Sequence, residues 1–317
     1  MKIIFYGTRE YDHYYFDVLA ADPEYGCEIR FLTANLDADT APLAQGGDAV
    51  CAFVNADCSV PVLEKLAQVG IRCLLLRCAG YNNVDLAAAQ KCGITVLRVP
   101  GYSPEAVAEH AMALAQAANR RICKAYIKVR NNNFALDGLL GYNLYGSSAG
   151  IVGTGRIGAA MARICHGFGM TVLAYDQYRN PALDGIVRYV ELDELLRTAD
   201  LISLHCPLTP ETHELVNARR LALMKPNAIL INTGRGPLVN EQDLADALNS
   251  GKIYAAGVDV LSSEPPRADN PLLTAKNCYI TPHIAWASTE ARERLMNIAI
   301  SNLQAYISGT PENVVNK

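Results

Sequence analysis

The sequence predicts an α/β fold of two doubly wound parallel-sheet domains, with the larger domain inserted into the smaller one. Short apolar segments that resemble strands alternate with helical patterns along most of the 317 residues, and this alternation is typical of parallel sheets. Proline-containing segments near Pro100 and Pro282 interrupt the alternation. The chain is also long enough to form two hydrophobic cores of ordinary size.

The smaller domain is expected to comprise residues 1–99 and 284–317. Its first part contains the predicted strands KIIFY, CEIRFL, DAVCAFV, IRCLLLR and ITVLRV, with helical patterns such as VPVLEKLAQVG between them. The C-terminal segment STEARERLMNIAISNLQAYISG has apolar residues at helical spacing and is long enough to return and pack on this domain. We therefore expect hinges at the two proline-containing segments.

The larger domain is expected to comprise residues 100–283. It should begin with an alanine-rich helix over 104–121 that has Pro104 in its first turn. The polar stretch NNNFALDGLLGYNLYGSS then predicts a long connecting loop. Further predicted strands are IVRYV, DLISLH, AILIN, YAAGVDV and CYITP, separated by helices such as LDELLRTA and EQDLADALNSG.

A glycine motif marks the expected ligand site of the larger domain. In AGIVGTGRIG an apolar strand ends at Gly153, and Gly155 and Gly158 open a helical pattern. The first glycine permits a tight turn, the second lets a pyrophosphate approach the backbone, and the third lets the helix pack closely on the strand. Such a motif alone can merely shape a loop. Here a second strand, TVLAYD, ends at Asp176, which predicts dinucleotide binding and favours NAD because a 2′-phosphate would meet a carboxylate.

The composition excludes several classes of protein. A formal charge of −4 and a pI near 5.9 give no electrostatic reason to expect a nucleic-acid partner. No apolar run approaches the roughly twenty residues that cross a bilayer, and the start MKIIFYGTRE resembles a strand rather than a signal peptide, so we expect a cytoplasmic protein without membrane contact. The ten cysteines form no C-x-x-C pair, which argues against a metal site and favours reduced thiols.

Three further segments place polar residues after predicted strands, where ligands gather in open α/β sheets. ILINTGRGPLVN carries Arg235, whose planar guanidinium suits a carboxylate held by two hydrogen bonds of roughly 1.5–3 kcal/mol each. A structural ion pair is the alternative. VDVLSSEPP carries Asp259 and Glu264, and CYITPHIAWAS carries His283 and Trp286. A carboxylate beside an imidazole fixes its tautomer, so Glu264 and His283 are predicted to act together in proton transfer.

These motifs together resemble the D-isomer-specific 2-hydroxyacid dehydrogenase family over essentially the whole chain. The motifs are AGIVGTGRIG with Asp176, LISLHCPLTPET, INTGRGPLVN, GVDVLSSEPP and ITPHIAWAS. The segments RCAGYNNVDLAAA, VPGYSPEAVAEHA and KIIFYGTREYD are most similar to D-lactate dehydrogenases, whereas NPLLTAKNCYITPHIAWAS resembles glycerate and hydroxypyruvate reductases. The resemblance implies Rossmann-like domains, NAD as cofactor, a small 2-keto or 2-hydroxy acid as substrate, and a homodimer formed through the helix over 104–121 and the loop after it.

The resemblance also assigns roles to single residues. Arg235 would bind the substrate carboxylate and polarise the C2 carbonyl, His283 would be the acid/base on the C2 oxygen, and Glu264 would orient His283. The substrate is further expected to contact Ala79, Gly80, Tyr102 and Trp286. The cofactor is expected to contact Gly153, Gly155, Arg156, Ile157, Gly158, Asp176, His205, Cys206, Pro207, Thr212, Thr233 and Asp259. The histidines outside these sets, His13, His110, His166 and His213, are expected to be structural.

The expected reaction is hydride transfer from NADH to C2 of a 2-keto acid, with pyruvate and D-lactate as the first choice of substrate and product. Closing of the two domains would exclude water from this site. Glycerate, hydroxypyruvate or phenylpyruvate reduction is the alternative within the family. Formate dehydrogenases pair their histidine with glutamine, so Glu264 argues against that activity. Phosphoglycerate dehydrogenases often add a regulatory domain, for which no room is expected after Lys317. A corepressor-like module that senses NAD is a distant alternative, since no low-complexity extension is present.

Overall fold

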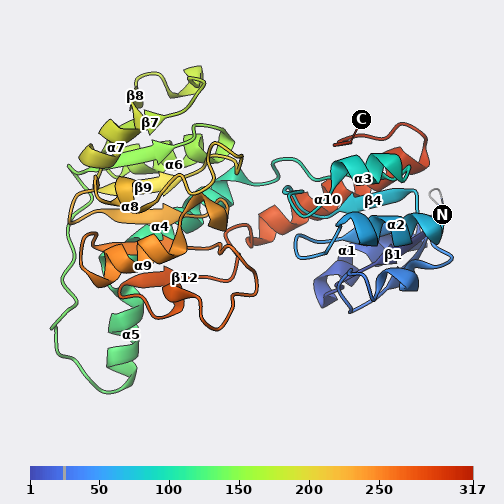
Figure 1. The fold of residues 1–317 in the computed structure, drawn as a ribbon, viewed down its shortest axis with the longest axis horizontal. Coiled ribbons are helices and arrows are strands. Elements are labelled where there is room, and N and C mark those ends of the chain that lie inside the picture. Colours follow the sequence, from blue (N-terminus) through green and yellow to red (C-terminus); the bar gives the residue numbers. More distant parts are fainter. Residues whose placement is uncertain (24–25, 317) are drawn as a thin grey trace. The chain divides into compact units, whose positions relative to one another are not determined.

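The computed structural model describes residues 1–23 and 26–316 and divides the chain into two compact units (Figure 1). Unit 1 comprises Met1–Tyr102 and Thr289–Lys317, and unit 2 comprises Ser103–Ser288. Unit 2 is thus one continuous segment flanked in sequence by the two parts of unit 1. The chain passes between the units after Tyr102 and after Ser288, whereas the sequence placed these breaks after Val99 and after His283. Both segments are irregular, so no change in periodicity marks the crossing point.

Unit 1 is built on a five-stranded sheet in the order β2-β1-β3-β4-β5, in which all neighbours are parallel. This confirms the parallel sheet that the alternating pattern predicts. The β3 and β4 strands are buried along their whole length, as their unbroken apolar sequences indicate. The bounds are β1 Lys2–Phe5, β2 Glu28–Phe31, β3 Ala49–Ala52, β4 Cys73–Leu76 and β5 Thr95–Leu97.

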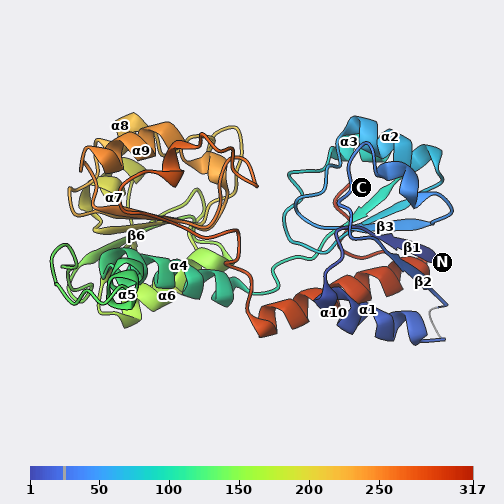
Figure 2. The ribbon, with the colours of Figure 1, turned by 90° about the horizontal axis from the view of Figure 1, so that it is seen from below.

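Helices cover both faces of the unit 1 sheet, with α2 and α3 on one face and α1 and α10 on the other (Figure 2). The C-terminal helix α10 buries Leu295, Met296, Ala299 and Leu303, and this helical spacing packs it beneath the sheet as the sequence predicts. The bounds are α1 Glu10–Ala21, α2 Val60–Gln68, α3 Leu86–Lys91 and α10 Thr289–Ile307, with a short 3-10 helix at Ala41–Ala44.

Unit 2 is built on a seven-stranded sheet in the order β12-β11-β10-β9-β6-β7-β8, again with parallel neighbours throughout. The chain runs outward from β6 through β7 to β8, and then returns to the other side of β6 and continues through β9. This reversal is the switch point at which open α/β sheets bind ligands. The bounds are β6 Ser148–Val152, β7 Thr171–Tyr175, β8 Val187–Tyr189, β9 Leu201–Leu204, β10 Ile229–Asn232, β11 Ala255–Val258 and β12 Cys278–Ile280.

The unit 2 sheet also has helices on both faces, with α4 and α6 on one and α7, α8 and α9 on the other (Figure 2). Each face has its own core of aliphatic side chains. The helices are α4 Pro104–Asn119, α5 Ile122–Arg130, α6 Arg156–Gly167, α7 Leu192–Thr198, α8 Ala218–Leu221 and α9 Glu241–Asn249. Short 3-10 helices lie at Pro181–Leu183, Gly236–Leu238 and Pro271–Leu273.

The helix expected over 104–121 ends earlier and is followed by a helix that the sequence does not predict. α4 stops at Asn119, and Arg121 adopts a left-handed conformation with φ of 53°. α5 then runs from Ile122 to Arg130 without a single buried residue. Its apolar residues Ile122, Tyr126, Ile127 and Val129 are exposed, so this helix contributes nothing to the core.

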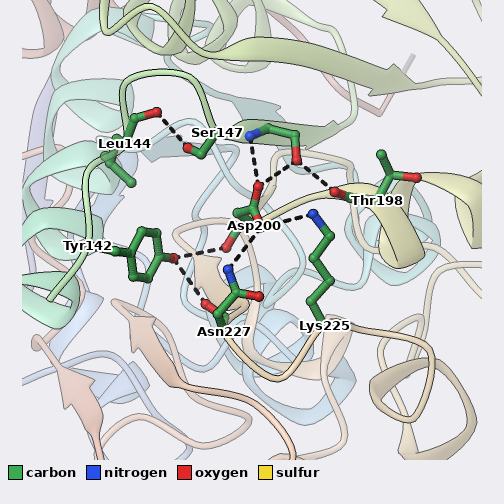
Figure 3. A network of polar contacts seen from close by, with 8 residues as sticks. Tyr142, Leu144, Ser147, Thr198, Asp200, Lys225 and Asn227 are labelled. Carbon is green, nitrogen blue, oxygen red and sulfur yellow. Dashed lines mark hydrogen bonds and ion pairs between the residues drawn. The ribbon is translucent and has the colours of Figure 1, made fainter.

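A carboxylate fastens the amino ends of the unit 2 strands. Asp200 directly precedes β9, and its Oδ2 accepts hydrogen bonds from the amide and the hydroxyl of Ser148, at 2.9 and 2.7 Å. Its Oδ1 accepts hydrogen bonds from Lys225 at 2.9 Å and from Asn227 at 3.0 Å (Figure 3). Burial alone would raise the pKa of Asp200, but these hydrogen bonds lower it to about 2. These four residues, called the Asp200 network below, tie the starts of β6 and β9 to the segment before β10.

Candidate active site

The turn after β6 has room for a ligand at one glycine only. Gly153 has φ of +92°, and a Cβ there would lie 2.6 Å from the amide nitrogen of Cys206. A Cβ on Gly158 would lie 1.9 Å from the carbonyl oxygen of Gly153. At Gly155, by contrast, no described atom comes within 4 Å of such a Cβ. The first and third glycines are thus required by packing, and the second leaves space for a phosphate at the start of α6.

Asp176 lies beside this turn, directly after β7. Its Oδ2 accepts hydrogen bonds from the amide and hydroxyl of Thr154, at 2.5 and 3.0 Å, and its Oδ1 accepts one from the amide of Tyr178 at 3.1 Å. Each carboxylate oxygen has two lone pairs, so Oδ1 retains one with which to accept a ribose hydroxyl. Arg156 and Ile157 form the first turn of α6, where helix amides lack intrahelical partners. The structure therefore gathers the predicted contacts for pyrophosphate and ribose around one turn.

The loop after β9 borders the glycine turn from the other side. The His205 amide donates to the carbonyl of Val152 at 2.7 Å, and the His205 ring contacts the hydroxyl of Ser203 at 2.8 Å. Burial lowers the pKa of His205 to about 4, so this imidazole is neutral at neutral pH. Burial also raises the pKa of Cys206 to about 11, which keeps its thiol protonated. Neither group is suited to proton transfer near neutral pH.

Pro207 and Thr212 belong to a compact turn that continues this loop. The Thr212 hydroxyl donates to the carbonyl of Pro207 at 2.7 Å and accepts a hydrogen bond from the amide of Thr209 at 2.7 Å. The Thr212 hydroxyl thus stabilises the turn over 207–212. Contact of these residues with a cofactor stays a prediction.

The turn after β10 carries Arg235 and is fixed by the side chain of Asn232. This buried amide donates to the carbonyl of Arg235 at 2.9 Å and accepts a hydrogen bond from the amide of Gly234 at 3.1 Å. The Arg235 guanidinium donates to the carbonyl of Gly234 at 2.7 Å. Within the described residues, the hydroxyl of Thr233 is buried and has no hydrogen-bond partner. A buried, unsatisfied hydroxyl at the ligand-binding edge of the sheet fits a polar group of a bound cofactor.

Close packing joins this turn to the loop after β11. A Cβ on Gly236 would lie 2.0 Å from the carbonyl carbon of Leu261, so only glycine allows the two loops to approach. The same loop after β11 carries Asp259 and Glu264. The turn that bears Arg235 therefore packs directly on the segment that bears the two predicted acids.

Asp259 is 1 % exposed and uses both carboxylate oxygens within unit 2. Its Oδ1 accepts hydrogen bonds from the Thr281 hydroxyl at 2.5 Å and the Ile284 amide at 2.9 Å, and its Oδ2 accepts one from the Ala285 amide at 2.7 Å. Burial alone would raise the pKa of Asp259, but hydrogen bonds from His110, Thr281 and these amides lower it. The structure thus shows this residue fastening the loop after β12, while the predicted contact with the cofactor stays a prediction.

Glu264 and His283 form the predicted pair. Oε2 of Glu264 lies 2.6 Å from Nδ1 of His283, and Oε1 accepts a hydrogen bond from the amide of Leu261 at 3.1 Å. Burial alone would raise the pKa of Glu264, but the hydrogen bond from His283 lowers it, so the carboxylate is ionised near neutral pH. An ionised carboxylate only accepts, which places a proton on Nδ1 and directs Nε2 toward other partners.

The backbone of His283 adopts an uncommon conformation, with φ of 55°. The His283 amide donates to the carbonyl of Asp259 at 2.8 Å, and the Trp286 indole donates to the carbonyl of His283 at 3.0 Å. Positive φ in a residue other than glycine persists only where the surrounding contacts enforce it. Trp286 is therefore placed next to His283, and its contact with a substrate stays a prediction.

The remaining predicted substrate residues belong to unit 1. The carbonyl of Ala79 accepts a hydrogen bond from Arg98 at 3.2 Å, and that of Gly80 accepts one from the Cys78 thiol at 3.2 Å. The carbonyl of Tyr102 accepts a hydrogen bond from Arg294 at 2.7 Å. The contacts of Ala79, Gly80 and Tyr102 with a substrate stay predictions.

Sequence reasoning missed several residues that organise the site. Asn232, Thr154 and Thr281 each bind a predicted site residue through a short polar side chain. Thr281 stands two residues before His283 in the same motif, and that proximity was the available signal. His110 lies far away in sequence, on α4, and nothing in its own segment announces its contact with Thr281.

Residues 1–23 and 26–316 contain no group of three or more His, Cys, Asp or Glu side chains that could hold a metal ion. In that same part of the chain, no helix is sufficiently long and apolar to cross a bilayer.

Comparison with known proteins identifies the larger unit. Residues 112–285 match the NAD binding domain of the D-isomer specific 2-hydroxyacid dehydrogenases. The hydroxypyruvate reductase of Blautia hydrogenotrophica is 48 % identical over 269 residues, which cover 81 % of each chain.

Two solved structures resemble the whole chain. The apo-structure of D-lactate dehydrogenase from Escherichia coli has a TM-score of 0.91 and 43 % identity, and the match covers 99 % of this chain and 100 % of that one. D-lactate dehydrogenase from Lactobacillus jensenii, solved with NAD⁺, has a TM-score of 0.80 and 32 % identity, and the match covers 100 % of both chains. These likenesses confirm the two parallel-sheet domains, the resemblance to the family and the NAD-binding character of unit 2.

Proposed function

This chain belongs to the D-isomer specific 2-hydroxyacid dehydrogenase family, and we propose that it reduces pyruvate to D-lactate with NADH. The observation that carries the proposal is the contact between Glu264 and His283 at the carboxyl edge of the unit 2 sheet, 2.6 Å from oxygen to nitrogen. This contact prepares one imidazole nitrogen for a substrate, at the same edge of the sheet as the turn that would hold a dinucleotide.

His283 is the proposed proton donor to the C2 oxygen of the keto acid. Glu264 accepts a hydrogen bond from Nδ1, and this fixes the ring orientation and leaves Nε2 as the nitrogen that faces the substrate. The carboxylate also stabilises the imidazolium form that donates the proton. In the reverse direction the same nitrogen would accept the proton from the alcohol.

Arg235 is the proposed binding group for the substrate carboxylate. Its turn is held by Asn232 and packed against the loop after β11 through Gly236, so the guanidinium starts from a fixed backbone. A planar guanidinium can bind a carboxylate through two parallel hydrogen bonds and orient C2 toward the cofactor. The proposed substrate contacts of Ala79, Gly80, Tyr102 and Trp286 supplement this interaction.

NAD is the proposed cofactor, and when bound it supplies the hydride. The open position at Gly155 and the amides of Arg156 and Ile157 would hold the pyrophosphate, and Asp176 would accept a hydrogen bond from a ribose hydroxyl. The buried Thr233 hydroxyl would form a hydrogen bond with the cofactor at its nicotinamide end. Asp176 would repel a 2′-phosphate at close range, which favours NADH over NADPH.

Hydroxypyruvate is the second candidate substrate. The segment NPLLTAKNCYITPHIAWAS and the similarity to a hydroxypyruvate reductase both favour it. The test compares kcat/KM for pyruvate, hydroxypyruvate and phenylpyruvate, each with NADH and NADPH, and determines the chirality of the product. We expect the highest value with pyruvate and NADH and a D-product. A preference for hydroxypyruvate would support the second candidate, and no turnover with any of the three acids would contradict the proposed activity.

A homodimer is the proposed assembly. The resemblance places its contact on the helix over 104–121 and the loop after it, but α4 is largely buried against the unit 2 sheet, so we place the contact on α5 and that loop. Ile122, Tyr126 and Ile127 on α5 are 52 %, 61 % and 58 % exposed, and Leu136 and Leu140 in the loop are 82 % and 89 % exposed. Lys128 and Lys124 donate to carbonyls of this loop, which holds it along α5. Grouped exposed apolar side chains mark protein-binding surfaces.

Sedimentation equilibrium tests this assembly. The parent is expected to be a dimer, and Ile127→Lys with Leu136→Lys is expected to be a monomer. Val18→Lys, at a 73 % exposed apolar position on α1, is the matched control and should leave the dimer intact. A monomeric parent, or a double variant that stays dimeric, would contradict the proposed interface.

A further inference from the structure

We infer that His110 is a positioning residue for His283 and that it acts through the hydroxyl of Thr281 and the carboxylate of Asp259. This inference rests on the proposed function, because it assigns His283 as the proton donor. Its structural basis is a continuous series of hydrogen bonds from α4 to the loop that bears His283. All of the residues involved belong to unit 2.

The series begins on α4, which packs against the unit 2 sheet. Nε2 of His110 lies 3.1 Å from the hydroxyl oxygen of Thr281, and that oxygen lies 2.5 Å from Oδ1 of Asp259. His110 also approaches Oδ1 of Asp259 directly, at 3.5 Å. The His110 side chain is 22 % exposed, whereas that of Asp259 is fully buried.

The direction of these hydrogen bonds follows from the number of protons. Asp259 is an ionised carboxylate and can only accept, so the single hydroxyl proton of Thr281 points toward it. The Thr281 oxygen must then accept from His110. Nε2 of His110 therefore carries a hydrogen, and His110 is the donor that completes the environment of the Thr281 hydroxyl.

Asp259 transmits this arrangement to the backbone around His283. The Asp259 carboxylate accepts hydrogen bonds from the amides of Ile284 and Ala285, and the Asp259 carbonyl accepts one from the amide of His283. These contacts enforce the positive φ of His283, an uncommon conformation that reverts unless it is held. Removal of the His110 donor leaves the Thr281 hydroxyl free to rotate. The hydrogen bonds by which Asp259 fixes the loop after β12 are then weakened.

A purely structural role at position 110 would require a side chain of suitable size, but no hydrogen-bond donor. The residue lines a surface groove of about 630 Å³ with Lys124, Lys128 and Tyr279, and an apolar side chain would fill the same space. A donor at Nε2, however, serves the Thr281 hydroxyl at 3.1 Å and the Asp259 carboxylate at 3.5 Å, and an apolar side chain cannot supply it. Glutamine places an amide nitrogen near the position of Nε2, so His110→Gln retains the donor, whereas His110→Leu removes it.

The kinetic test compares these two substitutions in the full-length protein. His110→Leu is expected to lower kcat about tenfold, because a displaced proton donor slows the chemical step, with the dissociation constant of NADH within twofold of the parent. His110→Gln is expected to recover most of kcat. His166→Leu, at an exposed position on α6, is the matched control and should match the parent. Equal losses in His110→Leu and His110→Gln, or a kcat within twofold of the parent in His110→Leu, would overturn the inference.

A double substitution tests the route through Thr281. Thr281→Val removes the hydroxyl through which His110 is proposed to act, so His110→Leu should have no further effect when Thr281→Val is already present. The double variant is expected to lose no more activity than Thr281→Val alone. Losses that multiply would show that the two residues act independently and would contradict the proposed series.

Amide hydrogen exchange of the peptide that spans 281–286 gives a readout that needs no activity. His110→Leu and Thr281→Val are expected to raise its exchange rate severalfold, while His110→Gln and His166→Leu leave it unchanged and the other unit 2 peptides keep their protection. If the parent turns over no keto acid but the loop loosens as expected, the proposed function fails and the series of contacts stands. If the parent is active and the loop exchanges equally in all variants, the positioning role is wrong.

Discussion

Asp200 and Asp259 are both buried carboxylates of unit 2, but they lie at opposite ends of the same sheet. Asp200 precedes β9 and binds the amide and hydroxyl of Ser148 together with Lys225 and Asn227. Asp259 follows β11 and binds Thr281 and two amides of an irregular loop. Hydrogen bonds lower the pKa of both groups against the opposing effect of burial. The chemistry is shared, and the difference lies in what each carboxylate holds.

Asp200 fastens the starts of regular strands, which the rest of the core already supports. Asp259 holds the backbone of His283 in a conformation that the chain does not favour by itself. We therefore expect the amino end of the sheet to contribute mainly to stability and the carboxyl end mainly to activity. Substitutions at the two ends should separate these properties.

The largest effect is expected for Arg235→Lys at the carboxyl end. A lysine ammonium cannot reproduce two parallel hydrogen bonds to a carboxylate, and each such bond contributes roughly 1.5–3 kcal/mol. The loss of these bonds corresponds to a decrease in kcat/KM of about 10²–10⁴-fold. We expect little change in the melting temperature. Arg219→Lys, in an exposed ion pair with Asp193, is the matched control. Near-normal turnover and KM in Arg235→Lys would remove Arg235 from substrate binding.

Asp259→Asn should follow in size. An amide at this position must present a donor to one of its partners, which disturbs the loop that carries His283. We expect kcat to fall on the order of 10–10²-fold, since small displacements of reacting groups have effects of this size. Steady-state kinetics and thermal unfolding of the same preparation check the result. A variant that lost stability but kept its kcat would assign Asp259 to the same role as Asp200.

Asp200→Asn should produce the opposite outcome. Loss of a charged acceptor that binds several donors is expected to reduce the free energy of unfolding by about 1.5–3 kcal/mol. The kcat at 25 °C should stay within twofold of the parent, because the Asp200 network lies at the far end of the sheet from His283. Urea unfolding monitored by circular dichroism, combined with kinetics, measures both. A large loss of kcat in the folded variant would break the distinction between the two ends.

The pH dependence of unfolding gives a second view of the same residue. The folded-state pKa of Asp200 is about 2 and its ordinary value is 3.8, so its contribution to stability is present above pH 3.8 and is lost as the pH falls toward 2. The parent should therefore lose stability across this window more steeply than Asp200→Asn. Equal slopes for the two proteins would show that the carboxylate is not held as the structure indicates.

The smallest effect is expected for Lys225→Met. Lys225 donates to Asp200 at 2.9 Å but is partly exposed, and such ion pairs contribute about 0.2–1 kcal/mol. Three other donors remain on the carboxylate. Urea unfolding should show a decrease within that range, and 1 M salt should reduce the difference between variant and parent. A larger loss than in Asp200→Asn would mean that Lys225 acts outside the Asp200 network.

The sequence predicts those parts of the molecule that local patterns determine. The parallel sheets follow from alternating apolar segments, and the glycine turn, Asp176 and the Glu264–His283 pair follow from polar residues placed directly after strands. α5 was not predicted, and what sets it apart from the other helices of unit 2 is that its apolar residues are exposed rather than buried in the core. The contact of His110 with Thr281 joins residues 171 positions apart, so only the packing of α4 on the sheet reveals it. The boundaries between the two compact units follow Tyr102 and Ser288, a few residues beyond the predicted ones, since irregular segments carry no boundary signal.

Kinetics of His283→Ala most directly test the central claim, which is that the carboxyl edge of the unit 2 sheet holds a proton donor. General acid catalysis by a positioned side chain contributes on the order of 10²–10⁴-fold. We predict that kcat for pyruvate reduction falls by about that factor while the dissociation constant of NADH, measured by fluorescence, stays within twofold of the parent value. A variant that retains kcat within tenfold of the parent would contradict the account.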